Sequence, residues 1–120
     1  MGGGLMEMIN VEVAQSFKRE AKDLAKRYKS LKQDLSDLID NLKDNPFMGT
    51  DLGGGVHKIR MAITSKGQGK SGGARVISYT DVLFETMSGR VVLLSIYDKS
   101  EQSTITDKRI KQLLKEAGIK

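Results

Sequence analysis

The chain has 120 residues, with 20 lysines and arginines, 15 aspartates and glutamates, one histidine and no cysteine. A chain of this length forms one domain and can bury a core without disulfides. One histidine and no thiol exclude Cys/His zinc fingers, histidine-based triads and pairs of catalytic histidines, so we expect no metal or cofactor. No apolar run approaches the ~20 residues that span a bilayer, and no signal-peptide pattern opens the chain. We expect a soluble cytoplasmic protein with no membrane partner.

The positive charge is concentrated in one quarter of the chain. The net charge is +5, and the segment 52–80 contains no acidic residue. It holds five basic residues: Lys58, Arg60, Lys66, Lys70 and Arg75. Elsewhere the basic and acidic residues balance. Such a segment attracts polyanions by releasing their counterions, so a nucleic acid is the first partner to consider. A solvated basic surface is the alternative.

The folded pattern begins near residue 8. We expect residues 1–7 to be a flexible leader or a cloning remnant, and residues 8–120 to form a single domain. Ile9, Val11 and Val13 alternate with polar residues, which predicts a strand with one buried face.

Two apolar stripes at helical spacing follow this strand. They cover residues 17–28 and 31–42. Ser30 and Gln33 have the spacing of a capping box that begins the second helix, and Pro46 ends it. Because almost nothing separates the stripes, we predict an αα-hairpin.

The C-terminal half predicts three strands and a short helix. The strands, rich in Val, Ile, Leu and Tyr, cover residues 56–63, 74–84 and 90–97. The helix covers residues 110–117, with Thr106 as its N-cap. Short connections make the three strands an antiparallel meander. The expected order is β-α-α-β-β-β-α. This is an α+β fold, a small antiparallel sheet with the helices packed on one face.

The loop of residues 64–73 contains two imperfect phosphate-binding patterns. Gly67, Gly69 and Gly72 have the spacing of a dinucleotide fingerprint, and Gly69-Lys70-Ser71 resembles the end of a P-loop. Both motifs must open a helix, whereas a strand follows here. We interpret the segment as a Gly-rich hairpin loop whose Lys66 and Lys70 bind RNA or are simply solvated.

Alternation assigns the remaining basic residues to one surface. Lys58 and Arg60 share a face of the first meander strand, and Arg75 begins the next. Tyr97 and Lys99 lie two residues apart at the end of the last strand, on a common side. These five side chains are expected to converge on a sheet surface that no helix covers. The alternatives are that Tyr97 packs in the core and that Lys99 lies in a solvated turn.

Three segments carry a family resemblance, in addition to the αα-hairpin after a first strand. They are residues 55–60 (GVHKIR), 70–79 (KSGGARVISY) and 93–100 (LLSIYDKS). Together they resemble the RelE/ParE superfamily of bacterial toxin–antitoxin toxins, and most closely its HigB-type branch. The resemblance covers residue 8 to about residue 118. The second and third segments are fairly specific as a pair.

The resemblance implies a microbial-RNase-like fold and ribosome-dependent cleavage of mRNA. It also implies a cognate antitoxin with a DNA-binding region. The basic catalytic surface of the family corresponds here to Lys58, Arg60, Arg75 and Lys99. Some members place a tyrosine or histidine after the last strand, where this chain has Glu101-Gln102-Ser103-Thr104. Tyr97, within the strand, is the nearest candidate for that catalytic role.

The chemistry of RNA cleavage is compatible with these residues. Attack by the 2′-hydroxyl needs a base, positive charge on the phosphate and an acid for the leaving 5′-oxygen. Arg60 and Arg75 can supply bidentate phosphate contacts. Lys58 or Lys99 can act as the base if the clustered cations favour its deprotonated form. Ribosomal positioning of the substrate would compensate for a weak catalytic set.

Two other functions remain open at the level of sequence. One is a ParE-like toxin that poisons DNA gyrase without a nuclease site, and the other is a non-catalytic RNA- or ribosome-binding module. For the toxin we expect a small antitoxin with an acidic segment. It would cover either the region between Lys58 and Lys99 or the αα-hairpin.

Overall fold

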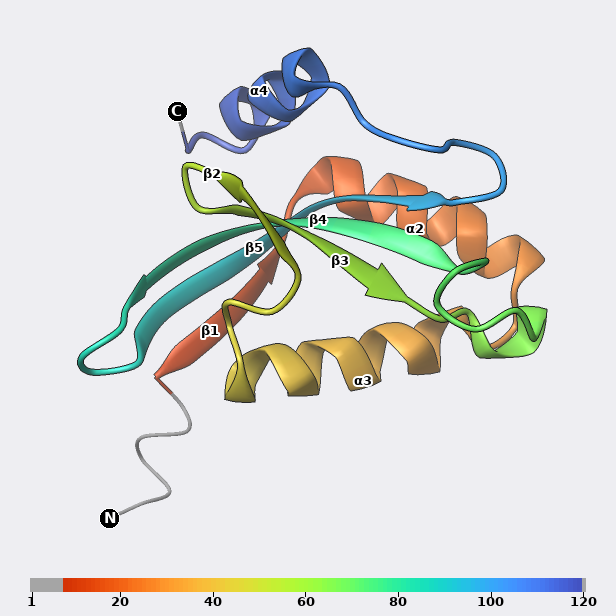
Figure 1. The fold of residues 1–120 in the computed structure, drawn as a ribbon, viewed down its shortest axis with the longest axis horizontal. Coiled ribbons are helices and arrows are strands. Elements are labelled where there is room, and N and C mark those ends of the chain that lie inside the picture. Colours follow the sequence, from red (N-terminus) through yellow and green to blue (C-terminus); the bar gives the residue numbers. More distant parts are fainter. Residues whose placement is uncertain (1–7, 120) are drawn as a thin grey trace.

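The computed structural model describes residues 8–119 (Figure 1), and the expected leader 1–7 lies outside the described residues. The strands are β1 Ile9–Val13, β2 Thr50–Gly53, β3 Val56–Met61, β4 Ala74–Leu83 and β5 Ser88–Asp98. The helices are α2 Gln15–Arg27, α3 Leu31–Asp44 and α4 Asp107–Glu116, and a short 3-10 helix, η1, covers Thr64–Lys66. The α+β class and the predicted order of elements are confirmed, with β2 as an additional strand.

All five strands form one sheet in the order β1-β5-β4-β3-β2. The predicted meander β3-β4-β5 is antiparallel, whereas β1 runs parallel to β5, so the sheet is mixed. The edge strand β2 was missed because its sequence, TDLG, has weak strand propensity and all four residues are exposed. It forms only through its antiparallel pairing with β3.

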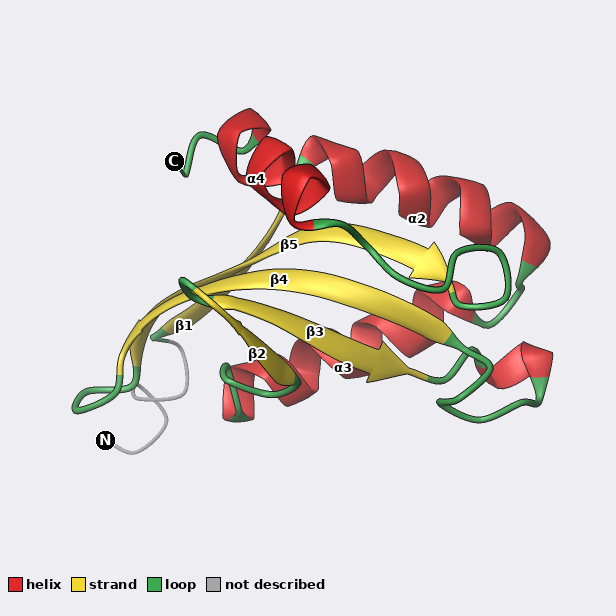
Figure 2. Ribbon diagram, turned by 45° about the horizontal axis from the view of Figure 1, so that its top comes forward, coloured by secondary structure: helices red, strands yellow, loops and turns green. Residues whose placement is uncertain are grey.

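Helices cover both faces of the sheet, which corrects the prediction of a single covered face. One core contains Phe17 and Leu24 of α2 with Leu31, Leu38 and Leu42 of α3. A second core, on the opposite face, lies under α4, and Figure 2 shows α3 and α4 on opposite sides of the sheet. The apolar stripe of α4 predicts an amphipathic helix, but it carries no information about which face receives it.

The strand β5 is buried on both faces. Residues 91–98 are all buried, and they pack alternately into the two cores. The register with β4 shifts between Ile77 and Ser78. This burial explains why the segment VVLLSIY is an almost continuous apolar run instead of an alternating one.

The connection between α2 and α3 differs from the predicted capping box. Ser30 is the N-cap of α3, but its side chain makes no capping hydrogen bond, and Gln33 bonds to Asp37 instead. The Ser30 hydroxyl donates to Asp34 and accepts from the backbone N–H of Ser65. Ser30 therefore joins the helical hairpin to η1.

The start of α4 follows the prediction. The side chain of Thr106 accepts a hydrogen bond from the backbone N–H of Arg109, which confirms Thr106 as the N-cap. None of the helices in residues 8–119 is long and apolar enough to cross a membrane.

The hydroxyl of Ser78 supplies a test of the sheet core. It is fully buried and has no hydrogen-bond partner among the described residues. Because an unsatisfied buried hydroxyl destabilises a fold, Ser78→Ala is expected to leave the free energy of unfolding unchanged or to raise it by about 1 kcal/mol. Ser95→Ala is the matched control. It removes a hydroxyl that donates to Glu20 at 2.8 Å, and should lower that free energy by about 1 kcal/mol. Urea unfolding measures both, and a larger loss for Ser78→Ala would contradict the packing described.

Candidate nucleic-acid interface

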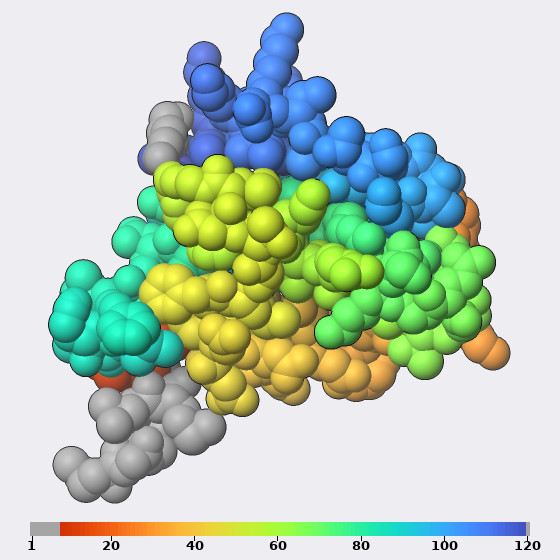
Figure 3. All heavy atoms as spheres, viewed as in Figure 1, coloured from red at the N-terminus to blue at the C-terminus, as the bar shows by residue number. Residues whose placement is uncertain are grey.

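Three neighbouring strands place two arginines and a tyrosine in one row. Arg60 of β3 lies opposite Arg75 of β4, and Arg75 lies opposite Tyr97 of β5. Lys58, two residues before Arg60, lies on the same face. This face also carries α4, so the expectation of a bare sheet surface was wrong for the part that α4 covers. Arg60 remains exposed. In Figure 3 the segment 58–75 reaches the surface between α3 and the loop that leads into α4.

Arg75 is held by backbone carbonyl groups instead of by a carboxylate. Its side chain is largely buried, and Nη1 donates to the carbonyl oxygens of Lys70 at 2.8 Å and Ala74 at 3.2 Å. Its cross-strand neighbour Arg60 has the same charge, which destabilises the pair. Among residues 8–119, none of the ion pairs involves Arg60 or Arg75. An anion bound between the two guanidinium groups would relieve this repulsion.

The flanking lysines lie at the margins of the row. Lys58 and Lys99 are half-buried, and Lys70 is exposed. The backbone N–H of Lys99 donates to the carbonyl of Gly73, which places Lys99 beside the start of β4. Its Nζ donates to the carbonyl of Ser103 at 3.2 Å. The two arginines of the row and these three lysines form a cluster of cations, which we call the basic face: Lys58, Arg60, Lys70, Arg75 and Lys99.

Tyr97 belongs to the core under α4 as well as to the row. Its ring is buried among the α4 side chains, as the core-packing alternative expected. Its hydroxyl is buried without a hydrogen-bond partner among the described residues. Burial raises the pKa of this hydroxyl, and the nearby charge of Arg75 opposes the shift. The hydroxyl therefore stays protonated at neutral pH and is a hydrogen-bond donor next to Arg75.

Lys66 does not join the basic face. Its Nζ donates to Asp98 at 2.7 Å and to Ser100 at 3.0 Å, and its side chain is only 12% exposed. It also lies over the ring of Tyr28, 5.6 Å from the centroid. This arrangement favours a structural role for Lys66 over the predicted contact with RNA.

Sequence reasoning missed two buried carboxylates beside the interface. Asp98 accepts hydrogen bonds from Lys66, Tyr28 and Ser100, and Asp34 accepts from the backbone and side chain of Thr64. The one available signal was that Asp98 directly continues an apolar strand. Asp34 gave no such signal, because it resembles any polar residue on an amphipathic helix.

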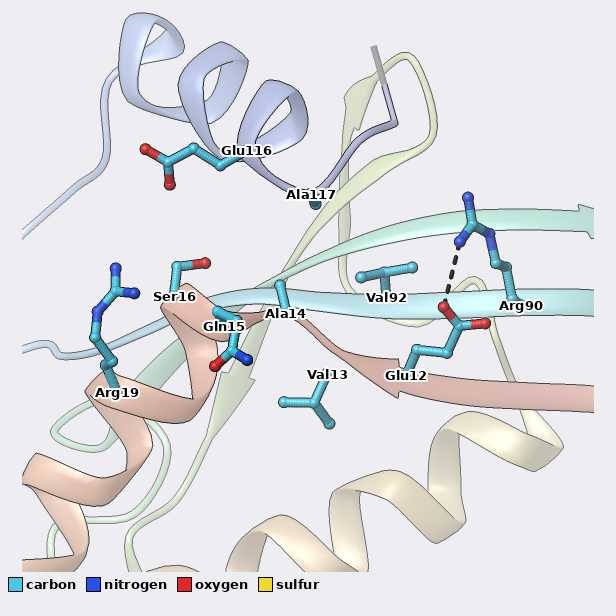
Figure 4. Close-up of a pocket in the computed structure, with 10 residues that line it drawn as sticks. All are labelled: Glu12, Val13, Ala14, Gln15, Ser16, Arg19, Arg90, Val92, Glu116 and Ala117. Carbon is cyan, nitrogen blue, oxygen red and sulfur yellow. Dashed lines mark hydrogen bonds and ion pairs between the residues drawn. The ribbon is translucent and has the colours of Figure 1, made fainter.

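One large cavity is separate from the basic face. It has a volume of about 540 Å³ and lies between β1, the start of α2 and the end of α4 (Figure 4). Its charges are mixed, because Arg19 and Arg90 are accompanied by Glu12 and Glu116, and Arg90 pairs with Glu12 at 3.2 Å. None of the sequence-predicted site residues lines it.

Comparison with known families gives a match over nearly the whole chain. Residues 10–119 match the family described as the RelE toxin of the RelE / RelB toxin-antitoxin system. The chain belongs to the RelE toxin family. The resemblance inferred from the three segments is thereby confirmed at the level of the family, while the HigB-type branch stays a prediction. As a RelE-family protein, the chain is the toxin of a toxin–antitoxin pair, and a cognate antitoxin is implied.

Proposed function

We propose that this RelE-family toxin is a cytoplasmic endonuclease that cleaves mRNA on the ribosome and thereby inhibits translation. The observation that carries the proposal is the cross-strand pair of Arg60 and Arg75, two like charges that no carboxylate in the described part of the chain neutralises. An anion bound at this pair would offset the repulsion, and a phosphodiester has the charge and the paired oxygens that guanidinium groups bind.

The proposed reaction uses the RNA as its own nucleophile. The 2′-oxygen attacks the adjacent phosphorus, the P–O5′ bond breaks, and the products carry a 2′,3′-cyclic phosphate and a 5′-hydroxyl. Arg60 and Arg75 stabilise the negative charge that develops on the phosphate. Lys58 and Lys99 flank them as candidates for taking the 2′-hydroxyl proton. Tyr97, whose hydroxyl stays protonated, is the candidate donor to the leaving 5′-oxygen if substrate binding uncovers it.

Addition of the purified toxin to a translating extract tests this function. Mapping of mRNA 5′ ends is expected to show cuts in phase with codons. Arrested translation with intact mRNA would support a non-catalytic ribosome binder instead. Unaffected translation with accumulated gyrase–DNA breaks would support a ParE-like toxin. Lys115→Ala is a suitable control, because Lys115 is an exposed cation of α4 outside the basic face.

The antitoxin surface favoured by the geometry is the groove between α2 and α3. This groove has a volume of about 300 Å³, and nearly all of its lining is apolar. Its apolar residues are Val13, Phe17, Ala21, Ala25, Leu31 and Leu35, and its rim carries Lys18, Lys22 and Lys32. An amphipathic helix with acidic flanks matches both features. We propose that the antitoxin, which also carries a DNA-binding region, places such a helix here.

Association kinetics test the two docking surfaces. Lys22→Glu in the groove is expected to slow association with the antitoxin by about tenfold at low salt, whereas Arg60→Glu on the basic face should have a smaller effect. The on-rate of the wild type should fall as ionic strength rises. Lys115→Glu serves as the matched control. A larger effect of Arg60→Glu would indicate that the antitoxin covers the basic face directly. An on-rate that does not change with ionic strength would contradict electrostatic steering.

A further inference from the structure

Two buried carboxylates from distant elements converge on η1. The side chain of Asp98, at the end of β5, is 0% exposed. It accepts hydrogen bonds from Tyr28 at 2.5 Å, from Lys66 at 2.7 Å, and from the backbone and hydroxyl of Ser100. Together these contacts bind the end of η1 to the end of β5 and to the helical hairpin.

The second carboxylate holds the start of η1. Asp34 of α3 is buried and accepts from the Thr64 backbone at 3.0 Å and from the Thr64 hydroxyl at 2.6 Å. Ser30, which donates to Asp34, also accepts from the backbone of Ser65. Every residue of η1 is thus bound by a side chain of another element. We call Asp34, Asp98 and Lys66 the clasp.

The clasp fixes the root of the loop that carries part of the basic face. Residues 67–73 follow η1 directly and contain four glycines, so this loop loses much conformational entropy when it is ordered. The carbonyl of Lys70, within the loop, accepts from Arg75. At the far root, the carbonyl of Gly73 accepts from the Lys99 backbone. A Cβ at position 73 would lie 2.2 Å from the Met61 carbonyl oxygen, so β3 approaches closely there.

Stability alone is a poor explanation for the clasp. Burial of a carboxylate and an ammonium group costs desolvation energy that their attraction roughly repays, and apolar residues of similar size often stabilise a fold better. A charged pair does, however, impose one geometry through its hydrogen bonds. The geometry imposed here is that of η1, from which the chain continues directly to Lys70, whose carbonyl accepts from Arg75.

We propose that Asp98 and Asp34 are positioning residues of the basic face, which hold the loop 67–73 so that Arg75 points at the scissile phosphate. The proposal rests on the proposed nuclease function. In it, neither carboxylate touches RNA. Both act through η1, the loop and the carbonyl of Lys70 on a single guanidinium group.

The first test measures the loop in the free toxin and needs no catalytic activity. In Asp98→Asn, backbone amides of residues 67–73 are expected to exchange hydrogen at least tenfold faster, after correction for any change at the amides of Val91 and Leu93 in β5, which report the loss of global stability. Thr64→Val, which removes one hydrogen bond to Asp34, is the milder variant if Asp98→Asn does not fold. Asp37→Asn, an exposed carboxylate on α3, is the matched control and should leave the loop unchanged.

The second test measures coupling to Arg75. Asp98→Asn is expected to lower the rate of ribosome-dependent cleavage at least tenfold in the wild-type background, but less than twofold in an Arg75→Lys background. If the role of Asp98 is purely structural, Asp98→Asn lowers the cleavage rate by the same factor in both backgrounds. Equal factors, or unchanged loop exchange in both Asp98→Asn and Thr64→Val, would overturn the proposal. If the wild type cleaves no mRNA, the proposed function fails, and the exchange measurement still decides whether the clasp orders the loop.

Discussion

Arg75→Ala is expected to lower the rate of mRNA cleavage on the ribosome by about 100- to 1,000-fold, the usual loss when one charge-stabilising donor is removed from a transition state. The guanidinium group lies in the row with Arg60 and Tyr97, and no carboxylate within residues 8–119 pairs with it. Its positive charge is therefore available to the phosphate. Cleavage assays on programmed ribosomes, with end mapping, measure the effect.

Stability must be measured on the same variant. Arg75 is largely buried, and its loss leaves the carbonyls of Lys70 and Ala74 without this donor, which should cost about 1–2 kcal/mol in the free energy of unfolding. A domain of this size survives such a loss. Arg75→Lys keeps the charge but not the bidentate geometry and should fall between the wild type and Arg75→Ala. If Arg75→Ala cleaves mRNA normally, Arg75 is structural and the phosphate site lies elsewhere.

Acid is expected to destabilise the toxin through Asp98, by about 2 kcal/mol between about pH 5 and pH 2. Burial by itself would raise the pKa of Asp98, but hydrogen bonds from Lys66, Tyr28 and Ser100 outweigh it and hold the pKa well below the usual 3.8. The folded state therefore binds this proton more weakly than the unfolded state. The stabilisation is complete above the unfolded pKa and is lost as pH falls toward the folded pKa.

Lys66, the ion-pair partner of Asp98, determines how the free energy of unfolding changes at high pH. The hydrogen bond to Asp98 raises the pKa of Lys66, so its contribution is complete at neutral pH and is lost only as pH rises through that raised pKa. Urea unfolding across pH is expected to show a plateau from about pH 5 to pH 9. In Asp98→Asn the free energy of unfolding should fall less in acid, whereas Asp37→Asn should lose as much as the wild type. If the free energy of unfolding of Asp98→Asn falls in acid as much as that of the wild type, the loss is caused by other carboxylates.

Local patterns in the sequence determined most of the framework. The αα-hairpin follows from two stripes at helical spacing, and the meander from three short apolar runs with brief connections. Thr106 identified the start of α4, and the segments around Arg75 and Tyr97 identified the family. These features are readable because each depends on residues close together along the chain. The convergence of Lys58 and Arg60 with Arg75 is of the same kind, since alternation and antiparallel pairing determine it.

The tertiary structure alone decided which side chains are free to meet a substrate. Lys66 and Lys70 are four residues apart in one Gly-rich loop, yet one is bound to a buried carboxylate and the other is exposed. Asp98 lies 32 residues from Lys66 along the chain. The sequence also left open the face that α4 covers. Contacts between distant segments depend on how amphipathic elements dock, and a pattern within one element carries no record of its partner.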